Sequence, residues 1–223
     1  MERALVIGAR GGIGAALRDA LAARPGMRAA VGLSRSGDGL DVTDEGSVAR
    51  VLGALEDDFD LVFIATGILD GAGHPPEKAL KDLAPEALVE QFHVNAAGPL
   101  ILLKHLVRLL PRDRRAVVAA LSARVGSIGD NGLGGWYSYR MAKAALNQGI
   151  RCAAIELGRS HRQAICVALH PGTVETRFTA SYAGRHRMVA PAEAAANLLR
   201  VIDGLGPADS GGFFDWAGKR VPW

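Results

Sequence analysis

Short apolar runs alternate with longer amphipathic segments along this chain. Apolar runs bounded by Gly, Pro or Asp are typical of strands that are buried on both faces of a sheet. We expect such strands at residues 4–7, 29–33, 61–65, 116–121, 165–169 and 212–215. Helical patterns predict helices at residues 12–23, 45–55, 85–110, 139–160 and 191–205. The segment 85–110 is either one long helix, ended by Pro111, or a broken pair.

The alternation of strands and helices predicts an α/β fold, with a doubly wound parallel sheet of about seven strands and helices on both faces. No repeat, low-complexity tract or linker interrupts residues 1–223, which we expect to form one domain. Loops rich in Gly or Pro follow strands at residues 67–76, 126–135 and 172–190. Because ligands bind at the carboxyl ends of parallel strands, all three loops should border one site.

Composition and charge exclude several classes of function. The chain has 223 residues, 49% of them hydrophobic, which is enough for a full core. A net charge of +3, without aromatic residues interleaved in a basic run, does not indicate nucleic-acid binding. The longest apolar run, residues 100–110, contains Lys104, His105 and Arg108 and is too short to span a membrane. We therefore expect neither nucleic acid nor a membrane as a partner.

The cysteines and histidines indicate no metal or disulfide chemistry. Cys152 and Cys166 lie in apolar stretches, and we expect both to be buried free thiols. Two cysteines cannot form a disulfide framework, and no signal peptide precedes the first strand, which favours the cytoplasm. The histidines lack partners at metal-ligand spacing, so we predict no metal.

A glycine cluster, Gly8, Gly12 and Gly14, follows the first strand and opens the first helix. The backbone there, including Ile13, can approach a pyrophosphate, whose charge is favoured at a helix N-terminus. The alternative is a tight turn without a ligand. The position of the glycine cluster in the first strand–helix unit favours dinucleotide binding.

The end of the second predicted strand bears on the choice of dinucleotide. An acidic residue there would bind the ribose 2′-hydroxyl of NAD, but the strand ends in Leu33, Ser34 and Arg35. Together with Arg10 in the glycine loop, Arg35 would suit a 2′-phosphate. We therefore expect NADP(H), with NAD(H) still possible, unless Arg35 is only a solvated loop residue.

Asp41 and Val42 follow shortly after the second predicted strand. Both could contact the adenine of a bound dinucleotide. The alternative for the Asp41 carboxylate is the N-cap of a surface helix.

Tyr139 and Lys143 are four residues apart in a predicted helix and therefore share one face. A phenol titrates near ~10 when unperturbed. A nearby ammonium group should lower the pKa of Tyr139. A tyrosine tuned in this way can act as a general acid or base near neutral pH.

These motifs, in this order, resemble the short-chain dehydrogenase/reductase family of the short single-domain type. Within it, the segments 126–128 and 211–216 and the long loop before Trp136 resemble the C-factor/sniffer-like carbonyl reductases. The resemblance covers nearly the whole chain and implies a Rossmann-type domain that binds both cofactor and substrate. The motifs that carry it are Gly8/Gly12/Gly14, Asp41, the segment 93–98, Tyr139/Lys143 and the segment 171–176.

The resemblance implies a role for each matching residue. Tyr139 would protonate the carbonyl oxygen, and Lys143 would lower the Tyr139 pKa and bind the nicotinamide ribose. Asn95 would hold a water of a proton relay, although a structural amide that distorts the helix is the alternative. Thr176, after the sixth strand, would contact the nicotinamide carboxamide or the phosphates. The other implied cofactor contacts are Ala65, Thr66, Gly67, Pro171, Gly172 and Val174. The resemblance also implies a homodimer or homotetramer.

The chain departs from the family at its active-site serine. Alignment on Gly126 puts Ala123 at the catalytic position and Ser122 one residue earlier. Ser127, in the following loop, could fold back towards Tyr139 and supply the hydroxyl. Ser122, Ser127 and no serine at all remain alternatives. A lost oxyanion donor typically costs ~10²–10³ in rate.

A second departure is the segment 64–67, Ile-Ala-Thr-Gly, where the family usually has Asn-Asn-Ala-Gly. The Thr66 hydroxyl should replace part of the lost amide. Trp136, Phe178, Tyr182 and Met188 lie in or near the loops expected to cover the pocket, and suggest an apolar or aromatic substrate. Core packing explains them nearly as well.

The leading hypothesis is therefore an NADP(H)-dependent oxidoreductase that acts on a small carbonyl or alcohol substrate. The alternative is an NADP(H)-binding signalling or sensor protein of the same fold with little turnover, which Ala123 and the altered segment 64–67 motivate.

Overall fold

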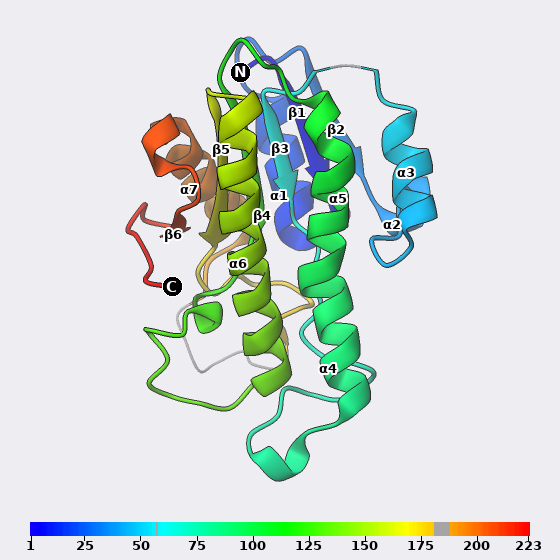
Figure 1. The fold of residues 1–223 in the computed structure, drawn as a ribbon, viewed down its shortest axis with the longest axis vertical. Helices are drawn as coiled ribbons and strands as arrows, with labels where there is room; N and C mark the ends of the chain where they lie inside the picture. Colours follow the sequence, from blue (N-terminus) through cyan, green and yellow to red (C-terminus); the bar gives the residue numbers. More distant parts are fainter. Residues whose placement is uncertain (57, 181–187) are drawn as a thin grey trace.

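A six-stranded parallel sheet forms the centre of the protein (Figure 1). The structure, a computed structural model, describes residues 1–56, 58–180 and 188–223. The strand order is β2-β1-β3-β4-β5-β6. The strands are β1 (Arg3–Ile7), β2 (Ala29–Leu33), β3 (Leu61–Ile64), β4 (Ala116–Leu121), β5 (Ala164–His170) and β6 (Phe213–Asp215).

The doubly wound parallel sheet is confirmed, but the expected count of about seven strands is one too high for the described residues. Each of the six apolar runs became a strand, and no further run was available to extend the sheet. One consequence concerns Thr176, which follows β5, the fifth strand, and not a sixth.

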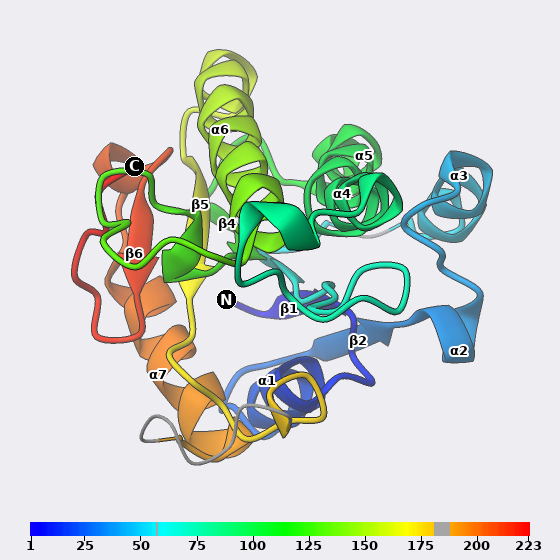
Figure 2. The same ribbon diagram turned by 90° about the horizontal axis from the view of Figure 1, so that it is seen from below.

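Helices cover both faces of the sheet (Figure 2). Two of them, α1 and α7, pack together on one face, whereas α4, α5 and α6 cover the other. The helices are α1 (Gly12–Ala22), α2 (Arg35–Asp38), α3 (Glu45–Gly53), α4 (Pro85–Phe92), α5 (Gly98–Leu106), α6 (Tyr137–Ser160) and α7 (Pro191–Gly204). Short 3₁₀ turns lie at Leu80–Asp82, Val107–Leu109, Arg124–Gly126 and Pro207–Asp209.

The core consists of two apolar layers separated by the sheet. Successive strand residues point to opposite faces, so Val6 and Val167 pack with residues of α1 and α7, while Leu5 and Ala168 pack with residues of α3, α5 and α6. The strands are buried on both faces, which explains their continuous apolar composition. Cys166 is buried in this core, but the prediction for Cys152 is wrong, because its thiol lies on the exposed face of α6.

The predicted helix over residues 85–110 is a broken pair. A π-helical segment, His93–Ala97, separates α4 from α5. Pro99, in the first turn of α5, has no N–H to donate to a preceding carbonyl, which favours the irregular segment immediately before it. The π segment carries Asn95, and π segments often occur at functional sites.

The strands share one direction, so the sheet has two different ends (Figure 1). Loops after β1, β3, β4 and β5 gather at the carboxyl end, and the chain begins at the opposite end. None of the helices in the described ranges is long and apolar enough to cross a membrane.

Candidate active site

The glycine loop after β1 is shaped so that side chains are excluded. Gly8 has φ 88°, and a Cβ added there would lie 2.8 Å from the Ala65 carbonyl oxygen. A Cβ at Gly12 would lie 2.6 Å from Thr176 Cγ2, and one at Gly14 would collide with the Gly8 carbonyl oxygen. The loop leads directly into α1, whose first turn contains Ile13 but no acidic residue. This cradle and the helix N-terminus fit a pyrophosphate.

The turn after β2 contains an acid that the sequence prediction missed. Asp38 Oδ2 accepts hydrogen bonds from Ser34 N at 2.8 Å and from Ser34 Oγ at 3.1 Å. Arg10 lies beside the same turn, with Nη1 donating to Ser36 Oγ at 3.3 Å. The strand itself ends without an acid, as the sequence indicates, but the short helix α2 (Arg35–Asp38) folds Asp38 back onto Ser34.

Asp41 and Val42 lie between this turn and α3. The Asp41 carboxylate accepts from both Thr43 Oγ1, at 2.7 Å, and Thr43 N, at 2.9 Å. These hydrogen bonds hold the pKa of Asp41 below its ordinary value. The alternative role as a helix N-cap is wrong, because Asp44 caps α3. Val42 packs against Gly98 at the start of α5.

Tyr139, Lys143 and Asn95 meet at the carboxyl end of the sheet, and all three are buried. Lys143 Nζ lies 5.8 Å from the centre of the Tyr139 ring and donates to the Leu121 carbonyl oxygen at 3.0 Å. A Cβ added at Gly67 would lie 2.8 Å from Asn95 Oδ1 and 3.6 Å from Lys143 Nζ. Gly67 therefore lies directly over both side chains.

The Asn95 side chain anchors the loop after β3. Its Oδ1 accepts from Ile68 N at 3.1 Å, and its Nδ2 donates to Ile68 O at 2.9 Å and to Gln91 Oε1 at 2.5 Å. The contacts of the Asn95 side chain are therefore those expected of a structural amide, the alternative to a role in a proton relay. Its backbone nevertheless lies in the π segment, where the regular helical hydrogen bonding is interrupted.

The expected lowering of the Tyr139 pKa is not found. Burial raises the pKa of the Tyr139 phenol above its ordinary value, and burial lowers the pKa of Lys143 to about 7. Both shifts have one cause, because removal from water disfavours the charged form of each group. With its pKa near 7, Lys143 is neutral in part of the molecules at neutral pH, and the neutral form exerts no Coulombic pull on the phenol.

Neither predicted serine hydroxyl hydrogen-bonds to Tyr139 in the described part of the chain. Ser122 Oγ donates to Asn147 Oδ1 at 2.6 Å, beneath α6. Ser127 Oγ donates to the Pro222 carbonyl oxygen at 2.5 Å and accepts from Asp130 N at 3.1 Å. Both serines are buried, and both hydroxyls are engaged in hydrogen bonds within the fold.

The remaining predicted cofactor contacts line the same end of the sheet. Thr66 carries a buried hydroxyl oxygen without a hydrogen-bond partner among the described residues. Gly172 has φ 79° and leaves room for the Trp216 ring. Ala65 packs beside Gly8, Pro171 and Val174 are buried after β5, and Thr176 touches Gly12.

Aromatic rings flank the Tyr139 phenol. The Trp136 ring lies 6.3 Å away, centre to centre, and the Phe178 ring 6.0 Å away. Tyr182 lies outside the described residues, and Met188 is half-buried. His170, at the end of β5, has a buried Nδ1 without a partner in the described ranges, and burial lowers its pKa to about 4.

Sequence reasoning also missed two buried polar residues, one on α6 and one against its start. Asn147 is four residues after Lys143 on the same helical face, a spacing that could have revealed it. Glu77, from the loop after β3, is buried against the start of α6, and no local pattern indicates this.

A buried Tyr–Lys pair beside a glycine cradle, at the carboxyl end of a doubly wound sheet, defines a class of dinucleotide-dependent oxidoreductases. A family model described as Enoyl-(Acyl carrier protein) reductase matches residues 16–206. The chain belongs to the short-chain dehydrogenase/reductase family, whose members act on carbonyl and alcohol groups, and is of the C-factor/sniffer-like kind.

Individual relatives agree with this assignment. The 1-hydroxy-2-glutathionyl-2-methyl-3-butene dehydrogenase of Rhodococcus sp. is 34% identical over 194 residues, covering 83% of this chain and 79% of the relative. The C-signal protein of Myxococcus xanthus is 37% identical over 145 residues, 65% of this chain and 84% of the relative.

Solved structures share the fold. Carbonyl reductase Sniffer of D. melanogaster has a TM-score of 0.85 at 23% identity, with all of both chains covered. An NADPH-bound carbonyl reductase from chicken fatty liver has a TM-score of 0.85 at 24% identity, covering 100% of this chain and 99% of that one.

Proposed function

We propose that this protein is an NADP(H)-dependent oxidoreductase that transfers hydride between the nicotinamide and a carbonyl or alcohol substrate. The observation that carries the proposal is the meeting of Tyr139, Lys143 and Asn95 around Gly67, beside the glycine cradle. Tyr139 and Lys143 lie four residues apart on α6, whereas Asn95 comes from the π segment, so the fold brings Asn95 to a pair that helical spacing already places together.

The chain offers a fitting site for the dinucleotide. The cradle of Gly8, Gly12 and Gly14 would hold the pyrophosphate, and Arg10 and Arg35 would flank the 2′-phosphate. The orphaned Thr66 hydroxyl, beside Gly67, would find a partner in the bound cofactor. When bound, NADP(H) supplies or accepts the hydride.

Tyr139 would act as the general acid in the direction of reduction. Because burial raises its pKa, the phenol holds a proton that it can donate to a carbonyl oxygen at neutral pH. Lys143, with a pKa of about 7, can take up or release a proton beside it. A protonated Lys143 would stabilise the phenolate that remains. A relay through Asn95 would return the proton from solvent.

A second candidate is an NADP(H)-binding sensor or signalling protein with little turnover. Ala123 occupies the catalytic serine position, and the hydroxyls of Ser122 and Ser127 are bonded elsewhere, which favours this candidate. The similarity to the protein named C-signal also supports it.

Oxidation of NADPH, followed by absorbance with a panel of aldehydes, ketones and quinones, tests the proposal. We expect turnover by the intact protein and a loss of at least ~10²-fold in kcat for Tyr139→Phe, because the proton donor is removed. Tyr137→Phe, two residues away in α6, is the matched control and should keep its rate. NADPH binding without turnover of any carbonyl would instead support the sensor.

The homodimer or homotetramer stays a prediction. The packed helices α4 and α6 leave apolar side chains exposed, with Phe92 at 53% and Met141 at 60% exposure. These side chains are available for a contact between two copies of the chain.

A further inference from the structure

The helix that carries Tyr139 begins without a cap of its own. Trp136, at the N-cap, makes no side-chain cap hydrogen bond, and the first turn of α6 contains no acidic residue. The backbone before it is left-handed at three consecutive residues, Gly134, Gly135 and Trp136, with φ 64°, 65° and 53°. A left-handed tryptophan is strained and needs support from its surroundings.

Glu77 supplies that support from the loop after β3. Its backbone carbonyl accepts from Trp136 N at 2.5 Å, and its carboxylate Oε2 accepts from Ser138 N at 3.2 Å. The residue is 3% exposed, and its other carboxylate oxygen, Oε1, is buried without a partner in the described part of the chain. A buried polar atom without a partner is costly, so such an arrangement persists only where the other contacts of the residue compensate. Here Glu77 accepts two N–H groups at the start of α6, which have no acceptor within the helix.

We propose that Glu77 is a positioning residue for catalysis, which caps α6 from a distant loop and thereby fixes the Tyr139 phenol. This inference rests on the proposed function. Ser138, whose N–H binds Glu77, immediately precedes Tyr139, and Trp136, held by the Glu77 carbonyl, packs its ring edge against the Tyr139 ring. Displacement of a reacting group by ~1 Å can cost roughly 10²-fold in rate.

The reach of the side chain, rather than its charge alone, is what the geometry requires. Glu77→Gln keeps the length and one oxygen acceptor for Ser138 N–H. Glu77→Asp keeps the charge but shortens the side chain by one methylene. Glu86→Gln, an exposed carboxylate of α4 that pairs with His74, is the matched control.

The experiment measures kcat, KM and NADPH affinity for these variants and for Glu77→Ala, beside Tyr139→Phe. We expect kcat to fall by about 10- to 100-fold in Glu77→Ala and Glu77→Asp. NADPH affinity should change less than about twofold, because the glycine cradle is on other elements. Glu77→Gln and Glu86→Gln should keep most of the wild-type kcat.

Two results would overturn the inference. One is an unchanged kcat in Glu77→Asp; the other is a kcat that falls by about 10-fold or more in Glu77→Gln, which would assign the effect to charge. These two variants decide the matter even if Glu77→Ala does not fold. Absence of turnover in the wild type would refute the proposed function instead, and is distinguished by the wild-type and Tyr139→Phe measurements.

Discussion

The contacts of Arg10 bear on cofactor choice at the scale of single residues. Its guanidinium group lies over the turn after β2 and binds Ser36 Oγ, beside the expected position of a 2′-phosphate. We expect Arg10→Ala to weaken NADPH binding by about tenfold, or ~1.4 kcal/mol, because a charge-assisted hydrogen bond is lost. NADH, which has no 2′-phosphate, should bind equally well to both proteins. Fluorescence titration with the two nucleotides measures this.

The control for this experiment is Arg18→Ala, which removes an exposed guanidinium of α1 that pairs with Asp19. An equal loss of affinity for NADPH and NADH in Arg10→Ala would contradict the 2′-phosphate assignment. It would mean that Arg10 shapes the glycine loop and does not recognise the phosphate.

What the sequence predicted at this scale depended on regular spacing. Tyr139 and Lys143 were found because a helix repeats at four residues, and the buried pair is in the structure. Asp38 and Glu77 were missed because a turn and a long loop return them to Ser34 and Ser138. The sign of the Tyr139 pKa shift was also wrong, because a sequence does not show how deeply a pair is buried.

Among the elements, the loop between β4 and α6 differs most from expectation. It was predicted to border the active site, and its start does pack there, because a Cβ added at Gly126 would lie 2.7 Å from Lys143 Cβ. The candidate hydroxyl, however, is bonded to the C-terminal segment: Ser127 Oγ donates to Pro222 O, and Gly129 N donates to Trp223 O at 2.8 Å. Trp223 in turn stacks on Phe213 of β6 at 5.9 Å. The contact joins segments 95 residues apart, which no local pattern encodes.

The elements themselves were predicted well wherever the pattern was long or fully apolar. Helix α6 and strand β4 lie within two residues of their predicted bounds. The break at Asn95 was left open, since residues 85–110 have apolar residues throughout, and only Pro99 marked the irregularity.

Substitution of the two serines separates a structural role from a catalytic one. We expect Ser127→Ala to lower the free energy of unfolding by about 1–2 kcal/mol, because it leaves the Pro222 carbonyl and Asp130 N–H without their partner. The kcat should change less than about threefold, since one lost donor at the reacting oxygen would cost ~10²–10³. Ser122→Ala, which breaks the bond to Asn147, should behave in the same way. Urea unfolding and kcat on the same samples test both variants, and a large loss of kcat at unchanged stability would restore that serine as the catalytic hydroxyl.

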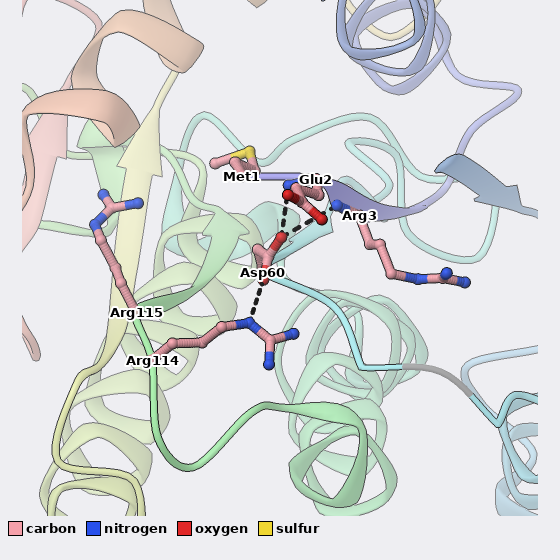
Figure 3. Close-up of a pocket in the computed structure, with 6 residues that line it drawn as sticks. All are labelled: Met1, Glu2, Arg3, Asp60, Arg114 and Arg115. Carbon is pink, nitrogen blue, oxygen red and sulfur yellow. Dashed lines mark hydrogen bonds and ion pairs between the residues drawn. The ribbon is translucent and has the colours of Figure 1, made fainter. Parts of the chain in front are cut away.

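At the scale of the whole molecule, the candidate active site and a cluster of hydrogen bonds that joins the strand starts lie at opposite ends of the sheet. The candidate active site is at the carboxyl end of the sheet, and a cavity of about 370 Å³ lies at the amino end (Figure 3). Asp60 lies in this cavity between the starts of three neighbouring strands. Its Oδ2 accepts from Glu2 N at 2.6 Å and Arg3 N at 3.1 Å, and its Oδ1 accepts from Arg114 Nε at 3.0 Å. We call Asp60 with its partners Glu2, Arg3 and Arg114 the Asp60 cluster. The strand–helix alternation predicted the doubly wound sheet but not this cluster, because its residues come from distant parts of the chain.

The Asp60 cluster predicts how the free energy of unfolding depends on pH. Burial alone would raise the pKa of Asp60, but the hydrogen bonds from Glu2 N, Arg114 and Arg3 N outweigh it and hold the pKa below its ordinary value. A carboxyl whose pKa is lowered on folding stabilises the protein at pH values above ~4, where the unfolded chain also carries it ionised. That stabilisation is lost as the pH falls through the lowered pKa of the folded state.

We therefore expect Asp60→Asn to lower the free energy of unfolding by about 1–3 kcal/mol at pH 7, since hydrogen bonds to a charged group are lost. The difference in free energy between Asp60→Asn and wild type should shrink steadily below pH ~4. There the Asp60 carboxyl takes up a proton first in the unfolded chain and then, at still lower pH, in the folded protein. Urea unfolding at pH 7 and at progressively lower pH measures it. Asp58→Asn, which removes an exposed carboxylate 3.7 Å from Arg114, is the control and should change little. NADPH affinity at pH 7 should be unaffected, because Asp60 is at the opposite end of the sheet from the glycine cradle. A stability difference that stays constant across this pH range would show that Asp60 contributes by packing and not as a carboxylate.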